Sequence, residues 1–213
     1  MWSRLLKLRF WLFQRHRYRN LVLEQVAGKP LIVLPDVFNP GLFPTGRFLA
    51  EQLPHFLQPH HAVLDMGTGT GIGAIFAAQI AQHVTAVDIN PEAVRCASIN
   101  AMLNRAEDRV RICQSDLFAA LADQQFDVIL FNPPYFRGQP ADHLDHAWRS
   151  VDVPERFAAE LPRYLRQDGF VLLVIATKVD LDQFMRPFEA FHVEEVASQS
   201  VIGEVWKVYK ISL

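Results

Sequence analysis

Cysteine is scarce in this 213-residue chain, and its two cysteines, Cys96 and Cys113, match neither a metal-binding spacing nor a disulfide framework. We therefore expect a reducing, cytoplasmic compartment. No run of about 18 apolar residues is present, so hydropathy predicts no membrane-spanning helix. The apolar stretch near the start is broken by Lys7 and Arg9, which argues against a signal peptide. Half of the residues are hydrophobic, which excludes global disorder and predicts one domain with a substantial core.

Acidic residues are absent from the first 20 positions, which contain six basic ones: Arg4, Lys7, Arg9, Arg15, Arg17 and Arg19. The rest of the chain has 15 basic and 23 acidic residues. We expect residues 1–28 to form a basic amphipathic arm ahead of a domain over residues 29–213. Such an arm can pack on the domain, bind RNA, the ribosome or another acidic partner, or lie on a membrane surface.

Strands and helices alternate from residue 62 onward. Apolar strands are predicted at 62–65, 84–88, 110–113, 126–131 and 170–176, and two more at 192–197 and 204–211. Alternation of this kind is typical of a parallel sheet covered on both faces. The last two strands are joined by a link too short for a crossover helix, so they should be antiparallel. The sequence predicts an α/β, Rossmann-like fold with a mostly parallel seven-stranded sheet and an antiparallel C-terminal strand. Ahead of this pattern, residues 31–34 are predicted as a short strand and residues 47–56 as a helix.

Four polar residues follow the predicted parallel strands: Asp65, Asp88, Asp116 and Asn132. An open α/β sheet binds its ligand beyond the carboxyl ends of its strands. These residues are therefore expected to converge on one site.

A glycine-rich turn, Asp65-Met66-Gly67-Thr68-Gly69-Thr70-Gly71, separates the first of these strands from its helix. Glycine lets the backbone approach a ligand closely, and the helix start that follows favours an anionic group. Asp88 lies 21 residues beyond Gly67, where a carboxylate can accept both hydroxyls of a ribose. These features indicate an adenosine-containing ligand but do not exclude a dinucleotide oxidoreductase.

The segment Asn132-Pro133-Pro134-Tyr135 follows the strand at 126–131 directly. Two consecutive prolines donate no backbone hydrogen bonds, so they cannot extend the sheet and leave carbonyl oxygens as acceptors. The Asn132 side chain adds another acceptor, and Tyr135 offers a flat face for stacking. This combination suits the binding of a planar group that carries an NH2. A dinucleotide oxidoreductase would have no evident use for such a loop.

Together these motifs resemble those of class I S-adenosylmethionine (SAM)-dependent methyltransferases, over about residues 30–213. Within them the chain is most similar to the HemK-like glutamine methyltransferases of release factors, in their short form. The segment Val37-Phe38-Asn39-Pro40, Thr45 ahead of a leucine-rich helix, and the run 204–211 carry this closer resemblance.

The resemblance implies two sets of site residues. The cofactor site would comprise Thr45, Asp65, Gly67, Thr68, Gly69, Gly71, Asp88, Ile89, Asp116, Leu117 and Asn132. The glycines would line the methionine part of SAM, Asp65 would place its amino group, Asp88 would hold the ribose, and Asp116 with Leu117 would border the adenine. Thr45 would close the pocket near the methyl group or the methionine tail. The catalytic loop would comprise Asn132, Pro133, Pro134 and Tyr135, which would hold the target nitrogen.

The chain departs from this family at Pro44, where an acid is usual, at residues 146–152, which replace a glycine-rich stretch, and in its basic arm.

The expected activity is N-methylation of a planar nitrogen, with a glutamine of a release-factor-like protein as the acceptor. A base amino group in RNA or DNA is the alternative acceptor, and a non-catalytic SAM-binding subunit is a further alternative, against which the intact Asn-Pro-Pro-Tyr loop argues.

Two groups of polar residues near the expected acceptor side have no assigned chemistry. Asp142, His143, Asp145 and His146 lack a recognised ligand spacing, so we predict a solvated loop and no metal. Arg137 and Arg149 could meet a phosphate or an acidic protein surface, or be ordinary surface charges, and the sequence does not decide between these.

Overall fold

The computed structural model describes residues 20–142, 144–177, 180–201 and 203–213. The predictions for the basic arm fall almost entirely on residues 1–19, outside this described part. No helix among the described residues is both long and apolar enough to cross a membrane.

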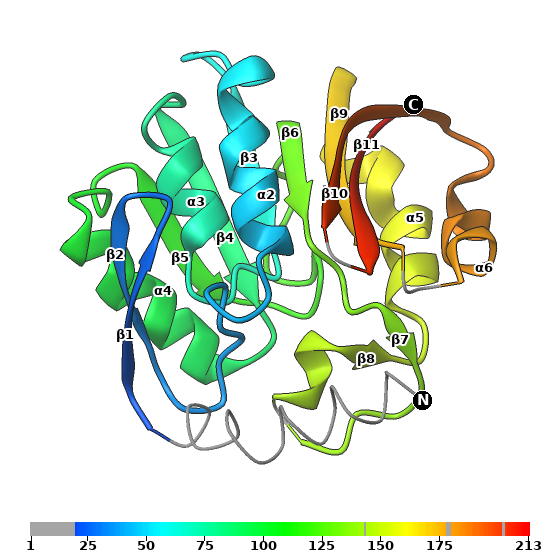
Figure 1. The fold of residues 1–213 in the computed structure, drawn as a ribbon. Helices are drawn as coiled ribbons and strands as arrows, with labels where there is room; N and C mark the ends of the chain where they lie inside the picture. The colour runs from blue at the N-terminus through cyan, green and yellow to red at the C-terminus, as the bar shows by residue number, and fades with distance from the viewer. Residues whose placement is uncertain (1–19, 143, 178–179, 202) are drawn as a thin grey trace.

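A seven-stranded sheet forms the centre of the domain, with strand order β10-β11-β9-β6-β3-β4-β5 (Figure 1). Its strands are β3 (Ala62–Met66), β4 (His83–Asp88), β5 (Val110–Gln114), β6 (Phe126–Phe131), β9 (Leu165–Ala176), β10 (His192–Val201) and β11 (Glu204–Ser212). Strands β5, β4, β3, β6 and β9 pair in parallel, whereas β11 runs antiparallel to both β9 and β10. The predicted fold class is confirmed.

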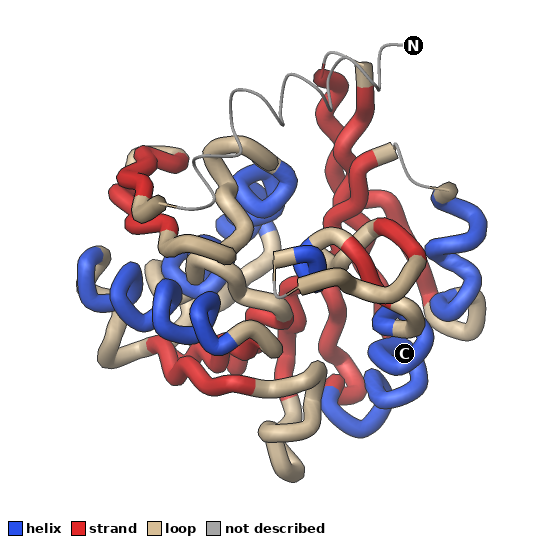
Figure 2. The backbone as a smooth tube through the Cα atoms, turned by 90° about the horizontal axis from the view of Figure 1, so that it is seen from below, coloured by secondary structure: helices blue, strands red, loops and turns tan. Residues whose placement is uncertain are grey.

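Helices cover both faces of this sheet (Figures 1 and 2). On one side lie α2 (Thr45–Gln52), α3 (Ile72–Ala77) and α4 (Pro91–Leu103), and on the other lie α5 (Val153–Tyr164) and α6 (Leu181–Met185). Short 3-10 turns follow α2 and α6 (Leu53–His55 and Arg186–Phe188), and a third spans Asp145–Ala147. Helix α3 is short, because the residues after Ala77 continue only as turns.

Burial of β6 on both sides explains its unbroken apolar sequence. Val128 and Leu130 pack with residues of α2 and α3, whereas Ile129 and Phe131 pack with residues of α5 on the opposite face. Side chains alternate between the two faces of a strand, so a central parallel strand must be apolar throughout.

A two-stranded hairpin, β1 (Val22–Val26) with β2 (Lys29–Val33), precedes the main sheet and does not join it. The buried Asn100 of α4 holds β2 in place: its Oδ1 accepts from the Ile32 N–H at 2.7 Å and its Nδ2 donates to the Ile32 carbonyl at 2.7 Å. The sequence predicted β2 but neither β1 nor this pairing. The expected boundary after residue 28 falls in the turn of the hairpin.

The order of the strands places the ends of β3 and β6 side by side. The chain runs from β3 to β4 and β5 on one side, and then crosses back to β6 and β9 on the other. A reversal of this kind opens a crevice at the carboxyl edge of the sheet. The glycine-rich turn after β3 and the Asn-Pro-Pro-Tyr segment after β6 therefore face each other across one crevice.

We predict that Gly71→Ala destabilises the fold more than Gly28→Ala does. Both glycines have positive φ, +84° and +79°, so alanine costs about 1–2 kcal/mol at either position. At Gly71 a new β-carbon would also lie 3.1 Å from the Cα and Cβ of Ala97, adding about 1–3 kcal/mol of overpacking, whereas nothing lies within 4 Å at Gly28. Urea denaturation of the two variants measures the difference. Equal losses of unfolding free energy would contradict this account of how the glycine-rich turn packs.

Candidate functional site

One cleft at the carboxyl edge of the sheet contains most of the residues predicted to form the site. It is lined by Asp65, Gly67, Thr68, Gly69, Asp88, Ile89, Asp116, Leu117, Asn132, Pro133, Pro134 and Tyr135. The two remaining predicted residues, Thr45 and Gly71, are not part of the lining. Gly71 begins α3, and Thr45 begins α2 with its hydroxyl directed toward Asn132.

The glycine-rich turn leaves its inner side open. Gly67 and Gly69 have φ values of +68° and +56°, and a β-carbon at either would meet no atom within 4 Å. At Gly73, by contrast, a β-carbon would lie 2.7 Å from the Asp65 carboxylate. Glycine at 67 and 69 therefore shapes a space for a ligand, while glycine at 73 makes room for Asp65.

Asp65 is buried and has only neutral hydrogen-bond donors. Its Oδ2 accepts from the Thr68 hydroxyl at 2.6 Å and from the Ala74 N–H at 2.9 Å. Burial raises the pKa of Asp65 to about 6, and the neighbouring Asp88 adds to the rise. A cationic group placed against this carboxylate would favour its charged form.

Asp88 is held by the backbone at the end of β4. Its Oδ2 accepts from the Gly69 N–H at 2.8 Å and its Oδ1 accepts from the Asn90 N–H at 2.9 Å. Each oxygen thus keeps acceptor capacity for a further donor, which is what two adjacent hydroxyls require. Burial raises the pKa of Asp88 above its ordinary value, although these backbone donors oppose the rise.

The turn after β5 borders the far end of the cleft. Leu117 is buried with a φ of +47°, and the Ser115 hydroxyl, which donates to the Leu117 carbonyl at 2.7 Å, braces this conformation. Asp116 accepts from Arg156 of α5 at 2.8 Å, so its charge is paired. Ile89, at the opposite wall, exposes 41% of its surface.

The Asn-Pro-Pro-Tyr segment is held through the side chain of its first residue. The Tyr135 hydroxyl donates to Asn132 Oδ1 at 2.5 Å, and the Thr45 hydroxyl donates to the same oxygen at 3.4 Å. Burial raises the pKa of Tyr135, so its hydroxyl stays protonated. The sequence predicted all three residues but not these contacts, because nothing in their spacing brings residue 45 to residue 132.

Three aromatic rings that the sequence did not single out as a group lie beside the cleft. Ring centroids are separated by 4.1 Å for Phe43 and Trp148, 4.9 Å for Phe38 and Trp148, and 5.3 Å for Phe38 and Phe43. Phe38 and Trp148 line the cleft. The cluster joins the loop ahead of α2 to the segment that follows the acceptor loop.

That following segment is more ordered than predicted. It contains a short parallel pair, β7 (Phe136–Arg137) with β8 (Arg149–Ser150). Of the residues predicted to form a solvated loop, Asp142 is exposed, whereas Asp145 and His146 are half-buried in a 3-10 turn and His146 lines the cleft, so the prediction was wrong for these two. His143 lies outside the described residues, and among those described no group of three or more His, Cys, Asp or Glu could hold a metal.

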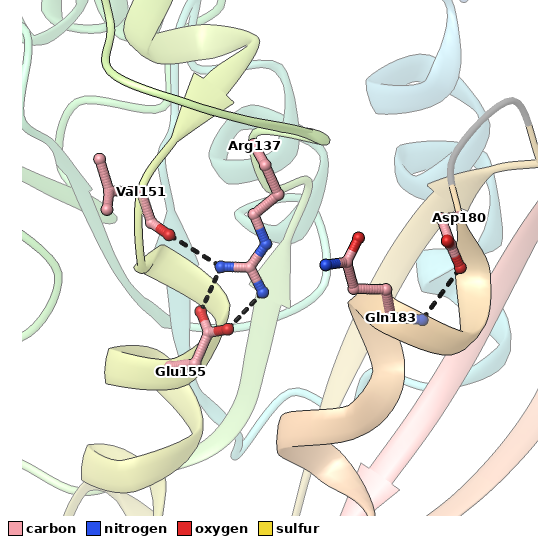
Figure 3. A network of polar contacts seen from close by, with 5 residues as sticks. All are labelled: Arg137, Val151, Glu155, Asp180 and Gln183. Atoms are coloured by element: carbon pink, nitrogen blue, oxygen red, sulfur yellow. Dashed lines mark hydrogen bonds and ion pairs between the residues drawn. The ribbon is translucent and has the colours of Figure 1, made fainter.

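The two arginines left unassigned by the sequence are both paired with carboxylates. Arg137 donates to both oxygens of Glu155 and, at 2.8 Å, to the Val151 carbonyl (Figure 3). This pairing raises the pKa of Arg137 and lowers that of Glu155. Arg149 bonds to Asp145 at 3.2 Å. Of the two, Arg149 lines the cleft and Arg137 does not, and each guanidinium is paired with a carboxylate.

Comparison with known proteins identifies related chains. Residues 30–204 match the profile of the methyltransferase small domain family. A Methanocaldococcus jannaschii protein named for protein N5-glutamine methyltransferase activity is 37% identical over 162 residues, which cover 72% of this chain and 79% of that protein. A release factor glutamine methyltransferase from Koribacter versatilis is 32% identical over 191 residues, 80% of this chain and 66% of that one.

Among solved structures, the 16S rRNA N2 G1207 methyltransferase of T. thermophilus, in complex with AdoMet and guanosine, superposes with a TM-score of 0.68. The match covers 91% of this chain and 50% of that one, at 24% identity. This likeness supports the fold alone. The chain spans half to four-fifths of the length of these three proteins.

We predict that Asp65→Asn flattens the pH dependence of stability between about pH 4 and pH 6. The folded-state pKa of Asp65 is about 6 and its ordinary value is 3.8, so the folded protein binds this proton more tightly than the unfolded chain. Asp65 therefore stabilises the fold below pH 4, and this stabilisation is lost as pH rises through 6, by about 3 kcal/mol in total.

Thermal or urea unfolding of the ligand-free protein from pH 4 to pH 7 measures this effect. The asparagine variant keeps an oxygen for Thr68 and Ala74 but does not titrate, so at pH 7 it should be the more stable protein. A variant whose stability falls with pH as steeply as that of the unsubstituted protein would show that Asp65 is not the titrating group.

Proposed function

Because the chain belongs to the methyltransferase small domain family, we propose that it transfers the methyl group of SAM to the side-chain amide nitrogen of a protein glutamine. The observation that carries this proposal is the position of the Asn132 carboxamide. It lies just after β6, in the same cleft as the buried carboxylate of Asp65 and the half-buried carboxylate of Asp88, at the ends of β3 and β4. The cleft therefore joins a site suited to an adenosine with a site suited to an NH2 group.

The residues at the β3 and β4 ends fit SAM. Gly67 and Gly69 leave open space where side chains would block a ligand. Asp88 retains an acceptor position on each carboxylate oxygen for the two ribose hydroxyls. Asp65 is buried without an ion pair among the described residues, which suits the ammonium group of the methionine part.

The acceptor loop fits a primary amide. Its prolines donate no hydrogen bonds, so the Pro133 carbonyl and Asn132 Oδ1 are available to accept the two N–H bonds of the target NH2. With both N–H bonds held, the face of the nitrogen that carries its lone pair is directed into the cleft. The same geometry would serve an amino group on a nucleic-acid base, so the loop alone does not select between the two acceptors.

The chain's own residues contribute orientation. Bound SAM supplies a methyl group that is already activated by its sulfonium, so no strong base is needed on the protein. Holding the nitrogen in line with that methyl is a proximity effect, worth up to about 7–11 kcal/mol in favourable cases. As the nitrogen–carbon bond forms, the carbon–sulfur bond of SAM would break and leave a neutral thioether, and the proton would then leave the nitrogen for water.

Charge favours a protein acceptor over a nucleic acid. Nucleic-acid binding relies on cations that neutralise phosphates. Near the cleft, Arg137, Arg149 and Arg156 are each paired with a carboxylate, and residues 21–213 carry 15 basic against 23 acidic residues. The two related chains at 37% and 32% identity are both named for glutamine methylation.

An RNA base remains the second candidate acceptor because the six basic residues at positions 4–19 could supply the missing phosphate contacts. If the arm serves this purpose, acceptor binding should weaken steeply with salt. A release factor or a ribosomal protein, by contrast, would be recognised by its own surface around the glutamine.

Labelled SAM separates these acceptors. The protein is incubated with cell extract depleted of RNA, with extract depleted of protein, and with a purified release factor, and the label is followed into each. We expect label in protein, at a glutamine when the modified peptide is sequenced by mass spectrometry. Label only in RNA would overturn the glutamine assignment, and measurable SAM binding with no labelling of any fraction would indicate a non-catalytic subunit.

We also predict that Asn132→Ala lowers kcat by roughly 100-fold or more while the Kd for SAM changes little. The substitution removes an acceptor that orients the target nitrogen, and misplacement on the scale of 1 Å can cost about 100-fold. Isothermal titration gives the Kd, and methyl transfer to the identified acceptor gives kcat.

Asn104→Ala is the matched control, because Asn104 bonds to the Pro30 carbonyl at 2.9 Å and is absent from the cleft. It should leave kcat near its original value. Near-normal turnover by Asn132→Ala would remove Asn132 from the mechanism.

A further inference from the structure

The Asn132 carboxamide oxygen receives two hydroxyl groups at very different distances. Tyr135 donates at 2.5 Å, at the short end of the range for O–H···O bonds, and Thr45 donates at 3.4 Å, beyond that range. A carboxamide oxygen has two lone pairs. The first contact is therefore strong and the second is weak enough to be replaced.

The Tyr135 hydroxyl is fixed by the core rather than by its own loop. Its ring packs against the buried cluster that includes Val174 and Trp206, and its oxygen lies 3.3 Å from the Val174 carbonyl of β9. The hydroxyl has one proton, and the shorter contact shows that it is directed to Asn132. Because burial keeps this hydroxyl protonated, it remains a donor across the physiological pH range.

This contact decides which way the carboxamide faces. The oxygen and the NH2 of an asparagine have nearly the same shape, so packing alone distinguishes them poorly. With Oδ1 bonded to Tyr135, Nδ2 is turned toward α2, where a β-carbon on Gly46 would lie 3.5 Å from it. A rotation of 180° would place an NH2 where the target NH2 must find an acceptor, and the two would repel.

We propose that Tyr135 is a positioning residue whose hydroxyl locks the Asn132 carboxamide with its oxygen available to the acceptor, and that the acceptor N–H replaces the weak Thr45 contact. This inference rests on the proposed N-methyl transfer but not on the identity of the acceptor. It assigns to the Tyr135 hydroxyl a role that is separate from stacking by its ring.

Tyr135→Phe tests the proposal because it keeps the ring and removes only the hydroxyl. We expect kcat to fall roughly 10- to 100-fold with the Kd for SAM unchanged. Tyr164→Phe makes the same chemical change at a buried tyrosine that stacks on Phe118 on the opposite side of the sheet, and should leave kcat unaffected.

A double-mutant cycle separates positioning from general damage. In an Asn132→Ala background, Tyr135→Phe should have no further effect on kcat, because there is no carboxamide left to orient. If Tyr135→Phe has the same kcat as the unsubstituted protein, the hydroxyl has no part in methyl transfer. If Tyr135→Phe still lowers kcat in the Asn132→Ala background, the hydroxyl acts on a group other than Asn132. Either result overturns the proposal.

The ligand-free protein provides a readout that needs no acceptor. The side-chain NH2 resonances of Asn132, assigned by comparison with Asn132→Ala, should shift in Tyr135→Phe and stay in place in Tyr164→Phe. Unshifted resonances would overturn the proposal whether or not methyl transfer is detected. The double-mutant cycle uses as acceptor whichever macromolecule the unsubstituted protein methylates. Methylation of RNA alone would refute the glutamine acceptor, and the cycle with RNA would still test the role of Tyr135.

Discussion

Two carboxylates, the buried Asp65 and the half-buried Asp88, lie together at the carboxyl edge of the sheet. Neither forms an ion pair with a described residue, and each is held only by neutral backbone or hydroxyl donors. Burying such groups costs stability, and both pKa values are raised in consequence. A fold keeps an arrangement of this kind where a ligand supplies the missing partners, and SAM brings an ammonium group and two ribose hydroxyls.

The topology of the sheet brings the proposed cofactor site and the Asn-Pro-Pro-Tyr segment together. Strands β3 and β6 are neighbours in the sheet although β4 and β5 lie between them in the sequence, and their register pairs Met66 with Phe131. Asn132 therefore follows directly beside the glycine-rich turn. The Tyr135 ring packs beside β9, and we propose that its hydroxyl sets the orientation of the Asn132 carboxamide.

Much of this structure could be predicted from the sequence, because its signals are local. Apolar runs such as 126–131 mark strands buried on two faces, and the glycines of residues 65–71 mark a turn in which Gly67, Gly69 and Gly71 have positive φ. The contact of Thr45 with Asn132 and the cluster of Phe38, Phe43 and Trp148 could not be predicted, since they join loops far apart in the chain. The strand β1 was missed because an apolar residue, Leu23, is exposed while the polar Glu24 is half-buried, which reverses the usual alternation, and because among the described strands it pairs with β2 alone.

The most direct test of this account is the number of protons exchanged when SAM binds at pH 6, measured by titration calorimetry in buffers of different ionisation enthalpy. Because burial raises the pKa of Asp65 to about 6, this carboxyl is partly protonated in the free protein, and an ammonium group beside it favours the charged form. We therefore expect net release of protons when SAM binds, of no more than one proton per SAM from this group. Binding of SAM with no proton exchange at this pH would show that its ammonium group does not meet Asp65, and would contradict the placement of the cofactor across the edge of the sheet.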